Sequence, residues 1–385
     1  MLKIIAIVSE YNPFHNGHLY QIQKIKEIFP DSVIISVMSG SLVQRGELAL
    51  FSKYSRAEIA VKHGVDLVLE LPSVYSNSPA NIFAFSAVYI MQKLSGIDYI
   101  CFGSESGDLE LLDFAAEKIM SDDFGYSLVK KIKANPNQSY PKSVYNLFFE
   151  LYGEEKAAVL NGSNNILALE YLKALKKLDS DIKPLTIKRT GADFNESASY
   201  IRKIIRDMQS LVGFAAPPFQ KGAVMPETAY KIFCELINNG KYTDINNISS
   251  AIISHLNRIE VEEYRVKKSL DGCFDYDSLI KKLEAKHITS SSVRRMILNI
   301  FFGITKNMQN NPPDFTVVLG FNQKGKNYLN SIRKKTEIEI VTKPANIKNN
   351  IIFEKNLFID NICKLALFNK NGEINSIKQK PFILI

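Results

Sequence analysis

The first part of the chain alternates continuous apolar runs with segments whose apolar residues recur every three or four positions. Continuous apolar runs are typical of strands buried on both faces of a parallel sheet. Such runs lie at residues 3–8, 32–38, 65–71 and 97–103, and helix-like segments between them lie at 17–29, 53–64 and 81–94. The alternation predicts an α/β fold with a doubly wound, mostly parallel sheet.

Residues that break regular structure mark the ends of these elements. Pro30 ends the first helix-like segment, Gly64 closes the second, and Pro72 ends the third apolar run. A helix over 164–178 and a strand over 182–189 continue the pattern. Ligands of such sheets bind beyond the carboxyl ends of the strands. The segments expected to carry function therefore follow strands, at 9–18, 39–47, 103–107 and 189–191.

The alternation stops near residue 210. A proline-containing segment at 214–226 is typical of a linker, helical patterns follow it, and residues 314–368 suggest a small strand-helix-strand-helix unit. We therefore expect two domains, residues 1–210 with the parallel sheet and residues 211–385 as a mainly helical C-terminal region.

Charge separates the two parts of the chain. The net charge is +8, of which residues 1–180 carry −3 and residues 181–385 carry +11. The second part is where a polyanion is expected to bind, although a basic surface that only aids solubility is the alternative. Candidate contacts, each of which could instead be a solvated face, are Arg294, Arg295, Arg333, Lys334, Lys335 and, more weakly, Lys267 and Lys268.

The spacing of the cysteines and the lengths of the apolar runs indicate in which cell compartment the protein is found. The four cysteines form no CxxC pair, so neither a disulfide framework nor a zinc knuckle is indicated. The apolar run after Met1 is too short for a signal peptide, and the one around 82–91 is too short to span a bilayer. We expect a cytoplasmic protein that does not enter a membrane.

Two of the five histidines, His15 and His18, follow the first predicted strand directly. A helix that begins there offers free N–H groups and a partial positive charge, which bind phosphate. Residues three apart can face one ligand, and imidazole N–H groups can stabilise charge on an attacked α-phosphate. Gly17 between them allows a close approach. The alternatives are a zinc pair, for which no third ligand is nearby, and two hydrogen-bonded turn histidines.

These residues carry a resemblance to known enzymes. "NPFHNGH" resembles the HxGH signature of the nucleotidyltransferase superfamily, which implies a Rossmann-like parallel sheet. Over about the first 205 residues the match narrows to the bacterial tRNA(Met) cytidine acetate ligase family. Five ordered motifs carry it: "IAIVSEYNPFHNGHLYQI", "VMSGSLVQRGELALFSKYSRAEIAVKHGVDLVLELP", "FGSESGD", "NGSNNILALEYLKAL" and "IKRTGADF…SASYIR".

The resemblance implies an ATP-dependent ligase. Acetate attacks the α-phosphate of ATP to give acetyl-adenylate and pyrophosphate, and the acetyl group passes to N4 of the wobble cytidine of elongator tRNA(Met). Mg²⁺ is expected to enter with ATP, and no protein metal site is expected. The partners implied are ATP, acetate and elongator tRNA(Met).

The resemblance also assigns residues. His15, His18 and Arg189 take catalytic roles on the phosphates, and Gly103 is the glycine over which the nucleotide lies. Asn164 is a nucleotide contact, with Asn165 the alternative if the register shifts by one. The ATP-binding stretch comprises Ile7, Val8, Ser9, Glu10, Tyr11, Asn12, Pro13, Phe14, His15, Asn16, Gly17, His18, Leu19 and Tyr20. Helix capping by the asparagines and a salt bridge at Arg189 are the alternatives.

Further positions follow from the same resemblance. Ser197, Ser199 and Arg202 match a second phosphate motif, although serines there are also common helix caps. Gln44 and Arg45 are expected near acetate or the target cytidine.

The second motif departs from the family pattern at two positions. Ser41 stands where the family usually has Asn, which puts an amide contact there in doubt, and Tyr54 stands where Trp is frequent. Lys53 and Arg56, in the same motif, could contact phosphate or lie on a solvated helix face.

Two other functions compete with the ligase. One is an adenylyltransferase for a small phosphorylated metabolite, which has no need of the basic C-terminal region. The other is a non-catalytic RNA-binding protein, which has no need of the intact His15-Asn16-Gly17-His18 motif.

Overall fold

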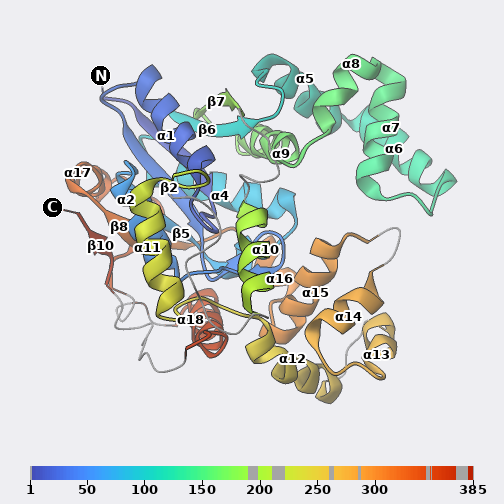
Figure 1. Cartoon of the computed structure of the whole chain (residues 1–385). Coiled ribbons are helices and arrows are strands. Elements are labelled where there is room, and N and C mark those ends of the chain that lie inside the picture. Colours follow the sequence, from blue (N-terminus) through green and yellow to red (C-terminus); the bar gives the residue numbers. More distant parts are fainter. Residues whose placement is uncertain are drawn as a thin grey trace.

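A computed structural model describes residues 2–189, 198–209, 222–259, 264–284, 288–343, 347, 349–369 and 380–384. Figure 1 shows a central sheet flanked by helices, with two further groups of helices that extend to one side. Each strand and helix predicted for residues 3–189 is present within two residues of its predicted bounds.

Within the described residues the main sheet has eight strands, in the order β10-β8-β5-β2-β1-β6-β7, with β9 paired to β8. β2, β5, β6 and β7 continue the parallel direction of β1, whereas β8 runs antiparallel to β5. β3 and β4 form a separate antiparallel hairpin. The strands are β1 (Ile4–Ser9), β2 (Val33–Ser39), β3 (Leu42–Val43), β4 (Glu47–Leu48), β5 (Leu67–Leu71), β6 (Tyr99–Ser104), β7 (Lys183–Lys188), β8 (Phe315–Phe321), β9 (Glu339–Val341) and β10 (Phe382–Ile383).

The helices follow the strands in the first part of the chain and dominate the second. They are α1 (Asn16–Ile28), α2 (Lys53–Lys62), α3 (Ser73–Ser76), α4 (Ala80–Leu94), α5 (Leu109–Met120), α6 (Asp122–Ala134), α7 (Tyr140–Tyr152), α8 (Glu154–Ala157), the 3₁₀ turn η1 (Ala158–Leu160), α9 (Ser163–Lys177), α10 (Ala198–Gln209), α11 (Glu227–Asn238), α12 (Asn246–Arg258), α13 (Tyr264–Leu270), α14 (Tyr276–Leu283), α15 (Ser290–Phe302), α16 (Lys306–Asn310), α17 (Gln323–Ile332) and α18 (Ile351–Leu365).

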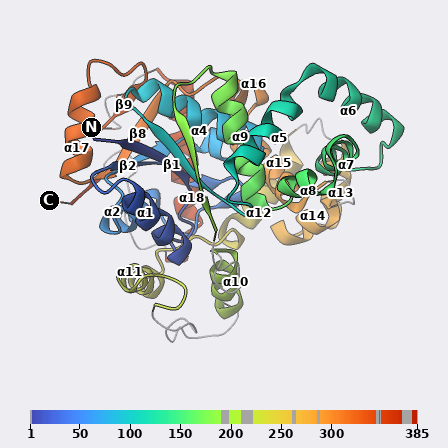
Figure 2. The ribbon, with the colours of Figure 1, turned by 90° about the horizontal axis from the view of Figure 1, so that it is seen from above.

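Helices cover both faces of the sheet, as Figure 2 shows, with α1, α2 and α11 on one side and α4 and α9 on the other. Alternate residues of one strand supply the two cores. Val33 and Ile35 of β2 pack with α4 and α9, whereas Ile34 packs with α1 and α2. Because successive strand side chains point to opposite faces, a strand buried on both sides must be apolar throughout. The predicted α/β class with a mostly parallel, doubly wound sheet is confirmed.

The C-terminal strands were expected to form a small unit of their own, and the structure corrects this. β8, β9 and β10 extend the main sheet beyond β5, so the sheet draws strands from both sides of the expected boundary at residue 210. β8 lies in the opposite direction to β5, with Val68 paired to Gly320. The proline-containing segment that suggested a linker lies outside the described residues for most of its length.

A third core holds the remaining helices together. Ile252 of α12, Leu279 of α14 and Ile297 of α15 are buried in it, next to Leu42 of β3. This group of helices lies at the lower right in Figure 1. No helix in the described ranges is long and apolar enough to cross a membrane.

Candidate active site

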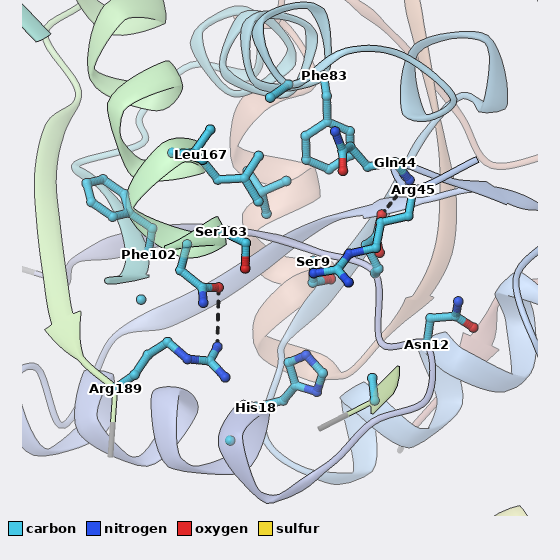
Figure 3. A pocket seen from close by; sticks show the side chains of 18 of the residues that line it. Ser9, Asn12, His18, Gln44, Arg45, Phe83, Phe102, Ser163, Leu167 and Arg189 are labelled. Carbon is cyan, nitrogen blue, oxygen red and sulfur yellow. Dashed lines mark hydrogen bonds between the residues drawn. The ribbon is translucent and has the colours of Figure 1, made fainter. Parts of the chain in front are cut away.

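A cavity of about 1000 Å³ opens at the carboxyl ends of β1, β6 and β7 (Figure 3). The order β2-β1-β6 places it where the chain direction around the sheet reverses, which is where parallel α/β sheets bind ligands. Val8 and Ser9 from β1, Phe102 and Gly103 from β6, and Arg189 after β7 contribute to its wall. The predicted segments that follow strands are thus brought together.

The His15–His18 segment is the start of α1. His15 is the N-cap residue, and the backbone N–H of Gly17 donates to its Nδ1 at 3.0 Å. The backbone N–H of His15 in turn donates to Nδ1 of His18 at 3.2 Å. This reciprocal pattern is a capping box built from two imidazoles. A Cβ on Gly17 would lie 2.9 Å from Cε1 of His15, so a side chain at position 17 would displace that ring.

The hydrogen bonds determine where the imidazole protons lie. Because Nδ1 of each ring accepts a backbone N–H, the neutral ring carries its proton on Nε2. Burial, with Arg189 and Arg202 nearby, lowers the pKa of His15 to about 4, and burial together with His15 and Arg189 lowers the pKa of His18 well below its usual range. Both rings line the cavity as neutral Nε2–H donors at pH 7.

The β1–α1 loop is held by residues far along the chain. The Asn12 side chain accepts a hydrogen bond from the Leu50 N–H at 2.7 Å, and Arg202 of α10 donates to the Asn12 carbonyl at 2.6 Å. Ser9 shares a hydrogen bond with Ser36 at 2.7 Å between their hydroxyl oxygens. These contacts fix the loop before any ligand is bound.

The opposite wall is formed by Gly103, Asn164 and Arg189. Arg189 donates to Oδ1 of Asn164 at 3.3 Å, and a Cβ on Gly103 would lie 3.3 Å from Cγ of Arg189. Asn164 lines the cavity and Asn165 does not. Asn165 is buried and accepts from the backbone N–H groups of Glu105 and Ser106, which is a structural role. The geometry therefore favours Asn164 as the ligand contact.

The second phosphate motif is only partly described. Ser197 lies outside the described residues, Arg202 lines the cavity, and Ser199 accepts a hydrogen bond from Arg202 at 3.4 Å. Ser199 is not part of the cavity wall.

Most of the predicted ATP-binding stretch reaches the cavity, but four of its members do not. Those that line it are Val8, Ser9, Glu10, Tyr11, Asn12, His15, Asn16, Gly17, His18 and Tyr20. Ile7, Pro13, Phe14 and Leu19 do not, and Ile7 and Phe14 are in the core. Phe14 packs against His18 with ring centroids 5.4 Å apart, so it supports the imidazole from behind.

Lys53 and Arg56 contact neither the cavity nor a solvated helix face, which corrects both expectations for them. Lys53 is 6% exposed, and its Nζ lies 2.8 Å from Glu70 and 2.6 Å from Asp360 of α18. Arg56 is 1% exposed and donates to the carbonyl of Glu10 at 2.6 Å and to that of Gly40. Arg56 therefore acts from behind the site, by holding the chain after β1 and β2.

Tertiary contacts position three further residues of the second motif and the pair Arg294 and Arg295. Gln44 and Arg45 line the cavity, and their placement near acetate or the target cytidine stays a prediction. Ser41 donates to Asp360 at 2.6 Å. Arg295 donates to the Gln44 carbonyl at 2.9 Å, and Arg294 pairs with Glu47 at 2.8 Å. The two arginines therefore hold the β3–β4 hairpin, and Arg295 also lines the cavity.

Sequence reasoning missed two groups of cavity residues. An apolar group comes from α4, α7 and α9, and includes Phe83, Tyr140 and Leu167. A polar group, Thr289, Ser291 and Ser292, comes from the start of α15. The apolar members match ordinary helix faces in the sequence, and α15 reaches the site only through long-range packing, so neither group has a local signal.

The chain is similar in sequence to known proteins over nearly its whole length. A family model described as HIGH Nucleotidyl Transferase matches residues 2–379. The tRNA(Met) cytidine acetate ligase of Caldanaerobacter subterraneus subsp. tengcongensis is 36% identical, covering 96% of each chain, and that of Clostridium acetobutylicum is 35% identical, covering 90% of this chain and 91% of the relative.

Solved structures agree with the sequence relatives. Thermotoga maritima TmcAL without ligand aligns over 100% of both chains with a TM-score of 0.86 and 29% identity. A second crystal form of that protein, bound with alpha-thio ATP, aligns over the same share with a TM-score of 0.85.

The sheet and the two capping histidines at its switch point define a nucleotidyltransferase of the HIGH class. Within that class, the chain belongs to the tRNA(Met) cytidine acetate ligase family. The resemblance seen in the five sequence motifs is confirmed.

Proposed function

We propose that this chain is an ATP-dependent ligase that activates acetate as acetyl-adenylate and transfers the acetyl group to N4 of the wobble cytidine of elongator tRNA(Met). The observation that carries the first step is the pair of neutral imidazoles, His15 and His18, whose ring centroids lie 3.8 Å apart in the cavity wall. Two Nε2–H donors at the N-terminus of α1 suit an α-phosphate that gains charge as acetate attacks.

The rest of the ATP site follows from the same wall. Arg189, after β7, is suited to the phosphates or the leaving pyrophosphate, because a guanidinium donates in a fixed fork. Gly103 leaves room for the nucleotide beside Arg189, and Asn164 orients that arginine through its Oδ1 atom. The catalytic assignments to His15, His18 and Arg189, and the binding role of Ser197, Ser199 and Arg202, are part of this proposal.

Mg²⁺ is proposed to enter with ATP, since this cation is usually bound through phosphates and few protein groups. In the described part of the chain, no three His, Cys, Asp or Glu side chains gather as a metal cage. A cytoplasmic location, where ATP and tRNA are available, is part of the same proposal.

The tRNA is proposed to bind the basic C-terminal region, whose net charge of +11 over residues 181–385 suits a polyanion. Of the helical group α12–α15, the start of α15 borders the cavity, through Thr289, Ser291, Ser292 and Arg295. A small-metabolite adenylyltransferase has no need of this basic region, and the curated relatives are named tRNA(Met) cytidine acetate ligases, so the ligase is favoured over it.

The test is pyrophosphate exchange into ATP with acetate as the sole carboxylate, with and without purified tRNA(Met), for wild type and His18→Ala. Acetate-dependent exchange that collapses in the variant supports acetyl-adenylate formation at this site. Absence of exchange under both conditions overturns the proposal and favours a phosphorylated metabolite as the acceptor of AMP.

A further inference from the structure

The cavity wall contains one acid among the described residues, Glu10. Its other charged side chains are all basic: Arg45, Lys188, Arg189, Arg202 and Arg295. ATP and tRNA are both polyanions, and a carboxylate in their site repels phosphate groups. A contact to phosphate therefore does not explain the Glu10 carboxylate, which must have another role.

The Glu10 carboxylate is fixed in place. Its Oε1 accepts the Gln44 N–H at 2.7 Å, and its own carbonyl accepts from Arg56 at 2.6 Å (Figure 3 shows the first contact as a dashed line beside Gln44). Among the described residues, Oε2 takes no further hydrogen bond, so it remains available to a ligand in the cavity. A carboxylate has acceptor sites on both oxygens, so one protein donor does not saturate it.

Glu10 is also tied to the C-terminal part of the wall. Gln44 donates its N–H to Glu10 and accepts at its carbonyl from Arg295 of α15 at 2.9 Å. Glu10 thus lies on the side of the cavity that α15 closes, whereas Asn164 and Arg189 bond to each other on the β6–β7 side. The target base is expected to enter from this side, because α15 belongs to the region proposed to bind tRNA.

The acceptor in the proposed function is the exocyclic amine of cytosine. Its lone pair is delocalised into the ring, so N4 is a weak nucleophile until a proton leaves. A carboxylate is the side chain that accepts a hydrogen bond from cytosine N4. Burial raises the pKa of Glu10, while the Gln44 N–H and the nearby guanidinium groups of Arg202, Arg45 and Arg56 act against this rise. The net result is a more basic carboxylate, which is a better proton acceptor near neutral pH.

We propose that Glu10 accepts an N4–H hydrogen bond from the target cytidine and removes that proton as N4 attacks the acetyl carbonyl. This inference rests on the proposed function and names the base of its second half-reaction. The N4–carbon bond forms, the bond from that carbon to the phosphate oxygen of AMP breaks, and AMP leaves with the electron pair. The proton passes from N4 to the Glu10 carboxylate and then to solvent.

The experiment compares wild type with Glu10→Gln in both half-reactions. Acetate-dependent pyrophosphate exchange reports the first, and single-turnover transfer of labelled acetate to tRNA(Met) reports the second. The glutamine keeps an acceptor for the Gln44 N–H but is not a base. We expect transfer to slow at least about 100-fold more than exchange does, in the range typical of a lost general base.

A pH profile separates a base from a structural carboxylate. Single-turnover transfer by wild type is expected to rise with pH to a plateau as Glu10 ionises, whereas the slow transfer by Glu10→Gln shows no such rise. Asp98→Asn is the matched control, because Asp98 also accepts a backbone N–H, from Ile4 at 2.8 Å, and lies outside the cavity wall. It should leave both half-reactions unchanged.

Two results overturn the inference while the proposed function stands. One is an equal loss of exchange and transfer in Glu10→Gln, which places Glu10 in acetate activation or in holding the hairpin. The other is transfer at the wild-type rate with the wild-type pH profile. If wild type itself shows neither exchange nor transfer, the proposed function falls, and this inference falls with it.

Discussion

The imidazole rings of His15 and His18 lie with their centroids 3.8 Å apart, and each accepts a backbone N–H at Nδ1. One arrangement therefore caps α1 and sets the tautomer of both rings. Because the pKa of each ring is lowered, the pair does not repel itself at neutral pH, and both Nε2–H groups remain donors. The structural role of these histidines and the chemical role that we propose for them use different atoms of the same ring.

His15→Asn is expected to separate those two roles. Asn is a good N-cap residue, so α1 should keep its first turn and the free energy of unfolding at pH 7.5 should change little. The Nε2–H donor is lost, and acetate-dependent pyrophosphate exchange should fall by about 10²–10³-fold, as for other removed transition-state donors. Steady-state exchange and urea unfolding measure the two effects. Exchange close to wild type would contradict a role for His15 on the phosphates.

The lowered pKa of His15 also predicts a pH dependence of stability. In the unfolded chain the group titrates near its ordinary value of 6.5, and in the folded chain near about 4. Between these values the unfolded chain binds more protons, so the free energy of unfolding falls as the pH falls. Comparing wild type with His15→Asn isolates this contribution, since Asn does not titrate. The difference in free energy of unfolding between wild type and His15→Asn should be constant above pH 7. By pH 4, wild type should have lost up to about 3 kcal/mol more than the variant.

Asn164→Ala is expected to affect ATP binding, whereas Asn165→Ala is expected to affect stability. Asn164→Ala removes the acceptor that orients Arg189, so the KM for ATP should rise while the melting temperature changes little. Asn165→Ala leaves the partly buried N–H groups of Glu105 and Ser106 without their acceptor and should cost about 1–3 kcal/mol of stability. Thermal unfolding and ATP saturation curves on both variants check this. A reversed pattern would move the nucleotide contact to Asn165.

Lys53→Met should be strongly destabilising. It leaves the carboxylates of Glu70 and Asp360 buried without their cation, and breaking a buried ion pair this way costs about 3–5 kcal/mol. Lys62→Met, on the same helix, removes a partly exposed pair with Glu58 and should cost less than about 1 kcal/mol. Urea unfolding of the two variants at pH 7 gives the comparison. Similar losses for both would show that the buried cluster does not join α2, β5 and α18 energetically.

Two exposed basic clusters should contribute unequally to tRNA binding. Arg333, Lys334 and Lys335 follow α17 and precede Thr336, whose hydroxyl donates to the Lys93 carbonyl at 3.0 Å. Lys93 is in the last turn of α4, where the strands begin, so this cluster lies at the end of the sheet away from the cavity. Lys267 and Lys268, on α13, are in the helical group that also contains α15.

Changing Lys267 and Lys268 to alanine should therefore weaken tRNA(Met) binding and reduce its salt dependence by about one to two released counterions, measured by filter binding. The triple change at Arg333, Lys334 and Lys335 serves as the comparison and should have the smaller effect. Pyrophosphate exchange without tRNA should be unchanged in both. A larger effect of the triple change would place the tRNA across the far end of the sheet.

The sequence alone determined the elements of the parallel sheet and the position of its chemistry. Buried strands such as β1 and β2 need apolar residues on both faces, and a helix start needs a capping residue, so both leave local signals. His15 and His18 follow β1, Gly103 lies near the end of β6 and Arg189 follows β7, and parallel topology brings these strand ends to one edge. These features depend on neighbours within a few positions in the chain.

Tertiary structure alone decided which charged residues face the cavity. Lys53 and Arg56 match exposed phosphate binders in the sequence, yet both are buried. Lys53 pairs with Asp360, more than 300 positions away, and Arg56 donates hydrogen bonds to the carbonyls of Glu10 and Gly40. Long-range strand pairing also places β8 in the main sheet, and long-range packing places α15 beside the cavity. A charge can be buried only where a distant partner offsets its desolvation, and no local pattern contains that partner.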